Sequence, residues 1–414
     1  MARFLFTMLL SDDLGLPTRL VPIARMLADR GHDVAVFNPL PAPASLIEDA
    51  GLKSLPMPTR VLPDAGSDLA GVGSAWDVEE LFGALFARED FIREATALHV
   101  DLVRDFAPDV VVDSFSLFGC MAARALKIPL ASVLQGNFHP ASDGFLGWKG
   151  PRPEGLVTAA PAVNKVLAEY GLAPVERAVE LISGDLSLVV GTPETDPVAA
   201  DATASWVGPI VWQRGDATLP DWVAALDRSK PVLWVYSGNP RYADAPTPVD
   251  SIVVIRAAIA ALADTSAQVV LTTGYQEVPA EIGALPENFH HAAYLPGRAM
   301  AERSDLMIHH GGHSSVMTGL STGTPAVIVP TMTERQSNAR HLAALGAGEI
   351  VIPSATADGE KQISTADFSA AVNRVLREAS YRASARRVAE SMKQYGGAPQ
   401  AADLIEQFAH ATVR

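Results

Sequence analysis

Short continuous apolar runs alternate along the chain with stretches whose apolar residues recur at helical spacing. In the first half, the runs cover residues 3–10, 34–37, 110–113 and 130–134. Runs of this length are typical of strands that are buried on both faces of a parallel sheet. Between the first two runs, a helix is predicted by Leu20, Ile23, Ala24 and Leu27, with Gly31 as a stop. The pattern therefore predicts a parallel sheet wrapped by helices.

The same pattern starts again after residue 230. Its apolar runs cover residues 232–236, 269–272, 306–309 and 326–329. Between the two series lies a stretch with Gly215 and Pro220, which predicts a linker at 206–225. We therefore expect an α/β protein with two Rossmann-like domains, 1–205 and 226–395, that face each other across a cleft. In open sheets of this kind, ligands bind at the carboxyl ends of the strands.

Composition narrows the class of protein. The chain has 414 residues and a formal charge of −15, and at roughly 150 residues per domain its length suits two or three domains. An acidic chain is a poor partner for nucleic acid or for an anionic membrane. Cys120 is the single cysteine, which excludes an internal disulfide. Because a reducing compartment fits this cysteine usage best, we expect a cytoplasmic protein.

The N-terminal apolar segment is too short to be a signal peptide. Residues 4–10 are apolar, but Ser11-Asp12-Asp13 follow at once, without a small-residue cleavage site. No uncharged apolar stretch reaches the length of about 18 residues that a membrane span needs. We expect a buried first strand here and no integral membrane span.

The strongest local signal for a ligand site is the segment His309-His310-Gly311-Gly312-His313-Ser314-Ser315. A predicted strand ends here and a helix begins, and we expect Ser314 and Ser315 to cap that helix. The two glycines let the backbone approach a ligand closely, and the helix N-terminus offers N–H groups, so a diphosphate is the natural guest. An ordinary capped turn is the alternative. No carboxylate or cysteine stands nearby at ligand spacing, so no metal is expected despite the three histidines.

The segments around this turn carry a resemblance to a known family. They are Tyr294-Leu295-Pro296-Gly297, His309 to Ser315, Gly323-Thr324-Pro325, Pro330, Glu334, Asn338-Ala339 and Gly346. Together they resemble the donor-site signature of nucleotide-sugar-dependent glycosyltransferases of the GT-B fold, family 1, which includes macrolide and antibiotic-tailoring enzymes of bacteria. Residues 19–34 are similar to that family's first helix and 207–209 to its linker entry. Residues 396–414 are similar to its terminal helix, which crosses back to the N-terminal domain.

The resemblance implies roles in binding the donor. Tyr294 stands where the family usually stacks a tryptophan on the nucleobase, and Leu295 would meet the base edge through its backbone. His310, with the N–H groups of residues 312–315, would hold the diphosphate. The donor-binding residues implied in this way are Ser237, Gly238, Tyr294, Leu295, His310, Gly312, His313, Ser314, Ser315, Thr318, Glu334 and Arg335.

Glu334 matches the acidic residue that binds the sugar hydroxyls, and Arg335 stands where a glutamine is usual. For Glu334 the alternative is a solvated acid at a helix start. For Asn338, which ends the motif, the alternative is simple helix capping.

One departure from the family pattern concerns the nucleotide. Where the family often has a glutamate that binds the ribose, this chain has Thr318. A threonine cannot accept two ribose hydroxyl hydrogen bonds as a carboxylate can. A donor without the 2′-hydroxyl would lose less, so this position favours dTDP-sugars over UDP-sugars.

A second departure concerns catalysis. The family usually places a basic histidine in the first loop, but Leu16 occupies that position here, and His32 is expected to be a surface turn residue. The family's aspartate partner matches Asp113. The candidates for the missing base are therefore Asp12 or Asp13 in the same loop, Asp113 acting directly, or His139 from the loop after residue 134. An acceptor that ionises easily would need none of them.

The resulting expectation is an inverting glycosyltransferase without a metal or cofactor. The partners are a nucleotide diphosphate sugar and a small, largely apolar acceptor, which would bind near Leu16, Phe138 and His139. The aromatic residues expected to line the acceptor pocket are Phe82, Phe86, Phe91, Phe138, Phe145 and Trp148. A homodimer is left open. The alternatives are a catalytically impaired homologue that assists a partner enzyme, and a sugar-nucleotide epimerase.

Overall fold

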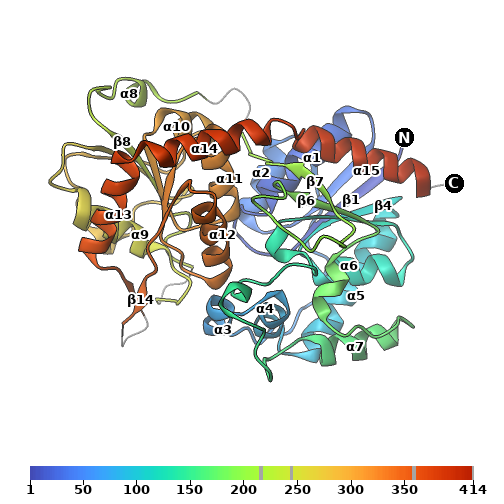
Figure 1. Ribbon diagram of the computed structural model, residues 1–414. Coiled ribbons are helices and arrows are strands. Elements are labelled where there is room, and N and C mark those ends of the chain that lie inside the picture. Colours follow the sequence, from blue (N-terminus) through green and yellow to red (C-terminus); the bar gives the residue numbers. More distant parts are fainter. Residues whose placement is uncertain (214–217, 243–245, 357–359, 413–414) are drawn as a thin grey trace. The chain divides into compact units, whose positions relative to one another are not determined.

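The chain forms two compact α/β units. The computed structural model describes residues 1–213, 218–242, 246–356 and 360–412. Unit 1 comprises residues 1–210 and 395–414, and unit 2 comprises residues 211–394 (Figure 1). Gly215, at the middle of the predicted linker, lies outside the described residues. Within the described residues, no helix is long and apolar enough to cross a membrane.

Unit 1 is built on a parallel sheet with the strand order β3-β2-β1-β4-β5-β6-β7. Its strands are β1 (Arg3–Met8), β2 (Asp33–Phe37), β3 (Lys53–Ser54), β4 (Val110–Ser114), β5 (Leu130–Leu134), β6 (Leu186–Val190) and β7 (Ser205–Gly208). The central strands are almost wholly buried, as their continuous apolar runs predict. The chain order reverses between β1 and β4, which makes that edge the topological switch point where ligands bind in such sheets.

The helices of unit 1 cover the sheet. They are α1 (Pro17–Asp29), α2 (Pro41–Asp49), α3 (Leu69–Ser74), α4 (Val78–Leu85), α5 (Glu89–Phe106), α6 (Leu117–Ala125), α7 (Ala160–Glu169) and α15 (Ala398–Thr412). Three short 3₁₀ helices accompany them: η1 (Gly136–Phe138), η2 (Gly147–Lys149) and η3 (Ala178–Ile182). The C-terminal helix α15, red in Figure 1, packs against α1.

Polar contacts hold α15 to the start of unit 1. Arg30 donates to Asp403 (2.6 Å) and to Glu406 (2.8 Å). His32 accepts from the backbone N–H of Ala2 through Nδ1, and its Nε2 lies 2.9 Å from Glu406 Oε1. The expectation that His32 is a surface turn residue is therefore wrong, because α15 and the first strand bury its ring.

Unit 2 repeats the same topology with the strand order β10-β9-β8-β11-β12-β13. Its strands are β8 (Val232–Tyr236), β9 (Gln268–Thr272), β10 (Phe289–Ala292), β11 (Leu306–His309), β12 (Ala326–Ile328) and β13 (Gly348–Ile350), with a hairpin of β14 (Ser354–Ala355) and β15 (Lys361–Gln362). Its helices are α8 (Asp221–Ala224), α9 (Ile252–Leu262), η4 (Ala280–Ile282), α10 (Gly297–Arg303), α11 (His313–Thr322), α12 (Thr333–Ala344), α13 (Thr365–Arg377) and α14 (Ala379–Met392). Here the switch point lies between β8 and β11.

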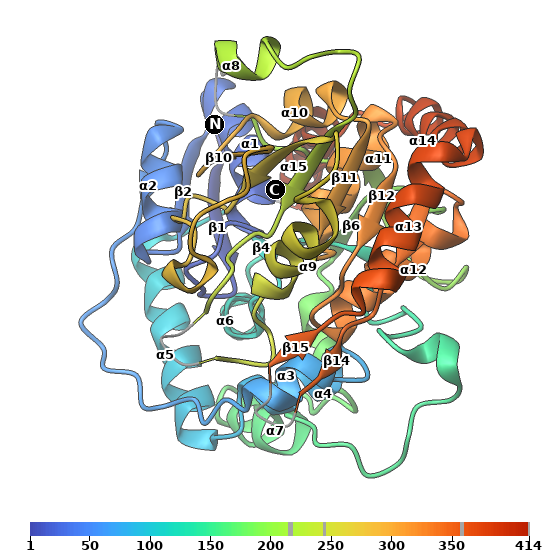
Figure 2. The same cartoon turned by 90° about the vertical axis from the view of Figure 1, so that its left-hand side faces the viewer.

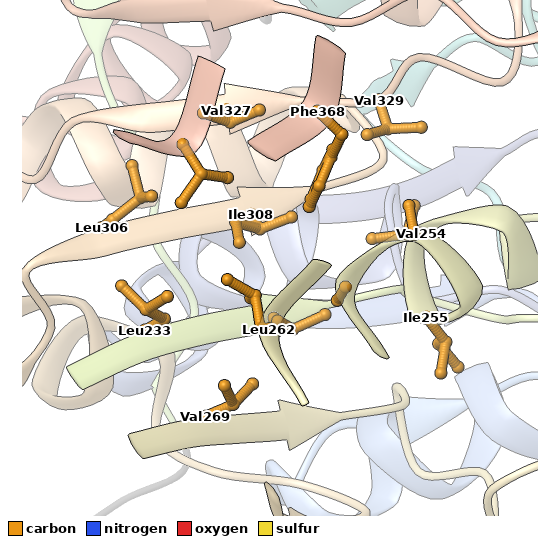
Figure 3. Packing of buried hydrophobic residues seen from close by; sticks show 14 of the residues in the cluster. Leu233, Val254, Ile255, Leu262, Val269, Leu306, Ile308, Val327, Val329 and Phe368 are labelled. Atoms are coloured by element: carbon orange, nitrogen blue, oxygen red, sulfur yellow. The ribbon is translucent and has the colours of Figure 1, made fainter. Parts of the chain in front are cut away.

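Alternating residues of the unit 2 strands face two different helix layers. Leu233, Ile308 and Val327 pack with residues of α9 and α13, among them Val254 and Phe368 (Figure 3). On the other face of the sheet, Trp234, Met307 and Ile328 pack with α10, α11, α12 and α14. In Figure 2, α9 lies in front of the strands that it covers. This three-layer packing fixes the ends of β8 and β11, and with them the loops that follow.

The structure changes one detail of the predicted linker. Residues 205–208, which span its start, form strand β7 and pair with β6 in parallel. Trp206 and Val207 are apolar enough to extend the sheet edge, and the buried Val207 packs into unit 1. Tyr395 returns to unit 1, where its side chain lies against Gly208, a residue with positive φ.

Candidate functional site

In unit 2, the predicted donor-site residues gather at the switch point. β11 ends at His309, and helix α11 begins at His313 with Gly312 as its N-cap. No side chain caps this helix. The expectation that Ser314 and Ser315 act as caps is therefore wrong, since both lie inside the first turn. Within that turn the N–H of Ser315 donates to the carbonyl oxygen of Gly312 at 3.0 Å, and the N-terminus of the helix, as the positive end of its dipole, favours an anion.

Gly311 allows the backbone to pass between β11 and α12. Its φ is +92°, and a Cβ there would lie 2.9 Å from the carbonyl oxygen of Arg335. The N–H of Gly311 donates to His309 Nδ1 at 3.1 Å, and burial lowers the pKa of His309 to about 3. His309 is therefore a neutral structural residue that shapes the turn.

His310 is enclosed by two glycines from different loops. A Cβ on Gly238 would lie 2.7 Å from His310 Cε1, and a Cβ on Gly312 would lie 2.7 Å from its Nε2. Burial lowers the pKa of His310 well below its ordinary value, and the charge of Arg335 acts in the same direction. Among the described residues, Nδ1 of His310 has no hydrogen-bond partner. The ring is thus a neutral imidazole at the switch point with one nitrogen unused by the protein.

Asn338 connects the Gly311 turn to Glu334. Its Nδ2 donates to the carbonyl oxygen of Gly311 at 3.0 Å and to Glu334 Oε1 at 2.7 Å. Asn338 lies in the middle of α12, so it is not a helix cap. The half-buried Glu334, in the first turn of α12, is therefore oriented relative to the turn that carries His310.

Arg335 is held by the protein. Its Nη2 donates to the hydroxyl of Tyr242 at 2.8 Å, and its Nη1 donates to Ser251 Oγ at 3.1 Å and to Thr331 Oγ1. Arg335 is also buried. The guanidinium ties the loop after β8 to the start of α12.

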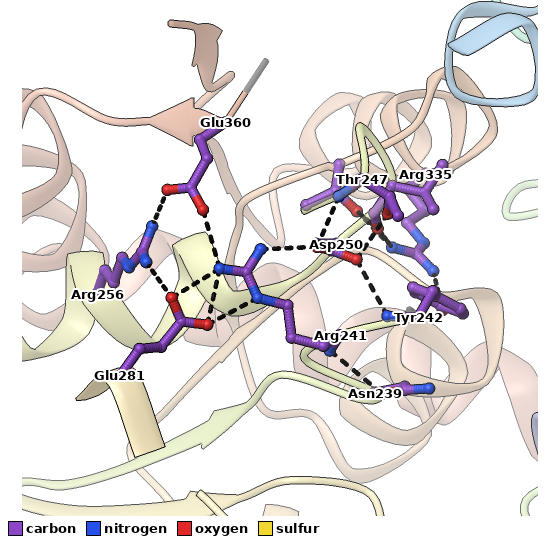
Figure 4. A network of polar contacts seen from close by, with 11 residues as sticks. Asn239, Arg241, Tyr242, Thr247, Asp250, Arg256, Glu281, Arg335 and Glu360 are labelled. Carbon is purple, nitrogen blue, oxygen red and sulfur yellow. Dashed lines mark hydrogen bonds and ion pairs between the residues drawn. The ribbon is translucent and has the colours of Figure 1, made fainter. Parts of the chain in front are cut away.

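The loop that carries Gly238 is fixed by a network of charges (Figure 4). Arg241 pairs with Asp250 (2.7 Å), Glu281 (2.7 Å) and Glu360 (2.9 Å), and Arg256 bridges the last two carboxylates. These pairs lower the pKa of Glu360. No sequence motif indicated this network, because Glu360 lies more than 100 residues after Arg241 and Arg256 in the sequence.

The remaining predicted donor-site residues outside the helices follow strands β8 and β10. Ser237 follows β8 and is buried, with its Oγ donating to the carbonyl oxygen of Gly238 at 3.0 Å. Tyr294 follows β10, and its ring stacks on Tyr275 with centroids 4.7 Å apart and planes 13° apart. Leu295 is buried in the core next to it. Tyr275, which sequence reasoning missed, has a positive φ of 73°.

Two further predicted donor-site residues belong to α11. Thr318 is buried, and its Oγ1 donates to the carbonyl oxygen of Ser314 at 2.8 Å. His313 is buried at the first position of the helix. Neither the Thr318 hydroxyl nor the His313 ring is exposed on the surface.

In unit 1, the acidic candidates lie at the other switch point, where β1 and β4 end. Asp13 Oδ1 accepts from the N–H of Gly15 at 2.8 Å, and Asp12 Oδ1 accepts from the N–H of Ala42 at 2.8 Å, which anchors the start of α2. Asp12 is exposed and Asp13 is half-buried. Leu16, also half-buried, precedes α1 as its N-cap residue.

Asp113 is enclosed. It is fully buried, accepts from Thr7 Oγ1 at 2.6 Å and from the N–H of Ser116 at 2.9 Å, and its burial raises the pKa to about 7. Thr7 is also fully buried. Asp113 is thus well matched to hold a proton at neutral pH but has no surface through which to touch an acceptor.

The aromatic residues predicted to line an acceptor pocket mostly pack against one another. Phe138 stacks on Phe115 with centroids 4.0 Å apart, and Phe86 meets Phe118 edge-on at 4.8 Å. Phe82 and Phe145 are fully buried. Phe82, Phe86, Phe138 and Phe145 thus belong to the core of unit 1, whereas Phe91 is half-buried and Trp148 is exposed.

The described residues contain no group of three or more His, Cys, Asp or Glu side chains placed to hold a metal ion.

Comparison with known proteins extends over both units. Residues 256–408 match the family model described as "Erythromycin biosynthesis protein CIII-like, C-terminal domain". The 4'-demethylrebeccamycin synthase of Lentzea aerocolonigenes is 26% identical over 425 residues, covering 94% of this chain and 95% of that relative. A PGL/p-HBAD biosynthesis glycosyltransferase of Mycobacterium tuberculosis is 25% identical over 340 residues, covering 77% of this chain and 75% of that relative. The solved structure of the glycosyltransferase VinC in complex with DTDP has a TM-score of 0.69 at 21% identity, covering 99% of this chain and 100% of that chain.

Proposed function

The chain carries an erythromycin biosynthesis protein CIII-like C-terminal domain and is a relative of bacterial glycosyltransferases with the GT-B fold, and from this premise we propose an inverting, metal-independent glycosyl transfer. A dTDP- or UDP-sugar binds to unit 2, and a small, largely apolar acceptor binds to unit 1. The acceptor is a natural product of the kind for which relatives such as 4'-demethylrebeccamycin synthase are named. The buried Thr318, in place of a ribose-binding carboxylate, supports dTDP as the nucleotide.

The observation that carries this proposal is the setting of His310. Its ring lies between Gly238 and Gly312, one nitrogen has no partner among the described residues, and the first turn of α11 follows directly. A diphosphate placed there accepts hydrogen bonds from backbone N–H groups and from the neutral imidazole in the tautomer that carries its proton on Nδ1. As the sugar–phosphate bond breaks, these donors and the helix dipole stabilise the charge that develops on the leaving group, so that no metal is required.

The transfer step then inverts the anomeric carbon. The acceptor oxygen forms a bond to that carbon on the face opposite the diphosphate, and the bond to the diphosphate oxygen breaks. Glu334, held by Asn338, accepts hydrogen bonds from sugar hydroxyls. We assign the removal of the acceptor proton to Asp13, because Asp12 anchors α2 and Asp113 is fully buried.

Replacing His310 with alanine tests the phosphate assignment. The loss of one hydrogen bond to a charged group should weaken dTDP binding about 10- to 100-fold in isothermal titration calorimetry. The matched control is His410→Ala, which removes an exposed imidazole in unit 1. Unchanged dTDP affinity in the His310 variant would show that the diphosphate lies elsewhere.

The pH dependence of donor binding tests the charge state of His310. Since burial keeps its pKa well below 6.5, the ring is neutral throughout the range from about pH 6 to 8. The affinity for dTDP-glucose, whose diphosphate does not titrate in this range, should therefore stay constant. A cationic His310 would instead lose its proton as the pH rises, and the affinity would fall.

A further inference from the structure

A cavity of about 440 Å³ lies in unit 1, apart from the predicted base at the β1 loop. It is bordered by the start of α4, by the loop after η1 and by η3. Its lining residues are Trp76, Asp77, Val78, Glu79, His139, Pro140, Ser142, Asp143, Gly144, Gly147, Gly150, Pro151, Arg152, Arg177 and Val179. The volume lies within the range of small-molecule sites, which is roughly 300–1,000 Å³.

The lining is unusually polar for such a site, because most ligand pockets are lined mainly by apolar groups. Charged side chains of both signs border it, and one indole ring accompanies them. Arg152 pairs with Asp77 at 2.6 Å, and Arg177 donates to the carbonyl oxygen of Pro140 at 3.1 Å. The phenylalanines that would have made an apolar pocket are packed into the core instead.

His139 supplies this cavity with an unused hydrogen-bond donor. Its ring is 5% exposed, and its Nδ1 accepts from the backbone N–H of Ala141 at 3.1 Å. Because Nδ1 accepts, the neutral ring must carry its proton on Nε2. Burial lowers the pKa of His139, which keeps the ring neutral. Nε2 has no hydrogen-bond partner among the described residues. With its proton on Nε2, His139 can donate to a ligand but cannot take the acceptor's proton there, which removes it from the candidates for the base.

Glu79 supplies an unused oxygen on the same cavity. Its side chain is 2% exposed, and Oε2 accepts from the backbone N–H of Val179 at 3.0 Å. Oε1 makes no hydrogen bond of normal geometry among the described residues. Burial raises the pKa of this carboxyl, and the backbone N–H groups of Val179, Ala160 and Ala178 oppose that rise. A buried polar atom without a partner costs free energy, which a bound ligand with a matching group can recover.

We propose that this cavity receives a polyhydroxylated part of the acceptor, a sugar or polyol ring, so that the acceptor is an otherwise largely apolar small molecule that already carries such a ring. A hydroxyl group both donates and accepts hydrogen bonds. Its oxygen can accept from the Nε2–H of His139, and its O–H can donate to a carboxyl oxygen of Glu79 or Asp143. The C–H face of such a ring packs on an indole, which Trp76 provides. This proposal rests on the proposed function, because it takes the cavity to be part of the acceptor site.

Two substitutions of His139 distinguish the hydrogen bond that Nδ1 accepts from the hydrogen bond that Nε2 can donate. In His139→Asn, the amide oxygen takes the place of Nδ1 and keeps the bond from Ala141, but the Nε2 donor is lost. In His139→Gln, the amide nitrogen takes the place of Nε2 and keeps the donor. The probes are a panel of p-nitrophenyl hexosides, with p-nitrophenol as the matched ligand without a sugar, and binding is measured by saturation-transfer NMR and calorimetry.

We expect at least one hexoside to bind the unmodified protein more tightly than p-nitrophenol does. His139→Asn should weaken that binding about 2- to 10-fold, the worth of one neutral hydrogen bond, whereas His139→Gln should keep it within about twofold. Equal losses in both variants, or no hexoside preferred over p-nitrophenol, would overturn the proposal. Titration of dTDP into the same three proteins separates the two failures: intact dTDP binding leaves the proposed function standing, and absent dTDP binding rejects both.

Discussion

Asp13→Asn is expected to lower turnover by about 10²–10⁴-fold, the usual contribution of a general base. The substitution keeps the shape of the side chain and an oxygen that can accept from the N–H of Gly15, but it removes the basicity. Affinity for dTDP should not change, because Asp13 belongs to unit 1 and the proposed diphosphate site to unit 2. Sugar transfer and dTDP affinity are therefore measured side by side.

Two matched variants identify which carboxylate acts. Asp12→Asn should affect mainly stability, since Asp12 anchors the start of α2 through the N–H of Ala42. Asp113→Asn removes a group whose pKa burial raises to about 7, yet the side chain is fully buried. We expect both to retain more turnover than the Asp13 variant.

The pH profile distinguishes an enzyme base from an acidic acceptor. A base acts when deprotonated, so turnover rises with pH through the pKa of the base. If Asp13 is that base, the rising limb disappears in Asp13→Asn alone. If Asp113 were the base, the limb would lie near pH 7 and would disappear in Asp113→Asn. If all three variants keep turnover within about twofold of the unmodified protein, far below the usual contribution of a base, the acceptor ionises unaided. A protein that binds dTDP-sugar but transfers nothing would be a catalytically impaired homologue.

Gly311→Ala is expected to destabilise unit 2 and to impair donor binding together. The φ of +92° is strained for any residue with a Cβ, and that Cβ would meet the carbonyl oxygen of Arg335 at 2.9 Å and Ile328 Cγ2 at 3.0 Å. Strain and overpacking of this kind cost about 1–3 kcal/mol each. Displacing the turn also moves His310 and the first N–H groups of α11, so we expect dTDP affinity to fall at least about tenfold, as for the loss of one charged hydrogen bond.

Gly283→Ala is the matched control in the same unit. Gly283 has a φ of +71° but no atom within 4 Å of an added Cβ. It should therefore show only the strain of the positive φ and should leave dTDP binding unchanged. Thermal melting and calorimetric titration of both variants check the comparison. If Gly311→Ala bound dTDP as the unmodified protein does, the turn would not be part of the donor site.

The central strands of both sheets were predictable because each is a largely apolar run, whereas β3, β6, β10 and β13 were not predicted. Residues 130–134, 232–236 and 306–309 form strands with the predicted bounds, and 110–113 lengthens by one residue. Runs of this kind must be buried on both faces, whatever the tertiary arrangement. The sequence pattern places the edge strand β7 in the linker instead, because β7 is short and its pairing with β6 is a tertiary contact.

The position of the site followed from the topology, but the state of its side chains did not. His310, Gly312 and Glu334 come together because parallel strands end at one edge of a sheet. Arg335 donates a hydrogen bond to Tyr242, which lies 93 residues away in the sequence. This contact depends on the conformation of the loop after β8. The packing of the phenylalanines of unit 1 also depends on the tertiary structure. Their residue type suits the lining of an apolar pocket, but they pack against one another in the core.

By itself, the sequence determined the α/β class, the two repeated series of strands and the turn with His310, because these depend on local apolar runs and on glycines at a strand end. Only the tertiary structure decided the raised pKa of Asp113, the tautomer of His139 and the polar cavity beside it. Each of these depends on burial and on one hydrogen bond or packing contact with another segment. No local pattern of residues encodes such a contact, because it exists only once the sheets have formed.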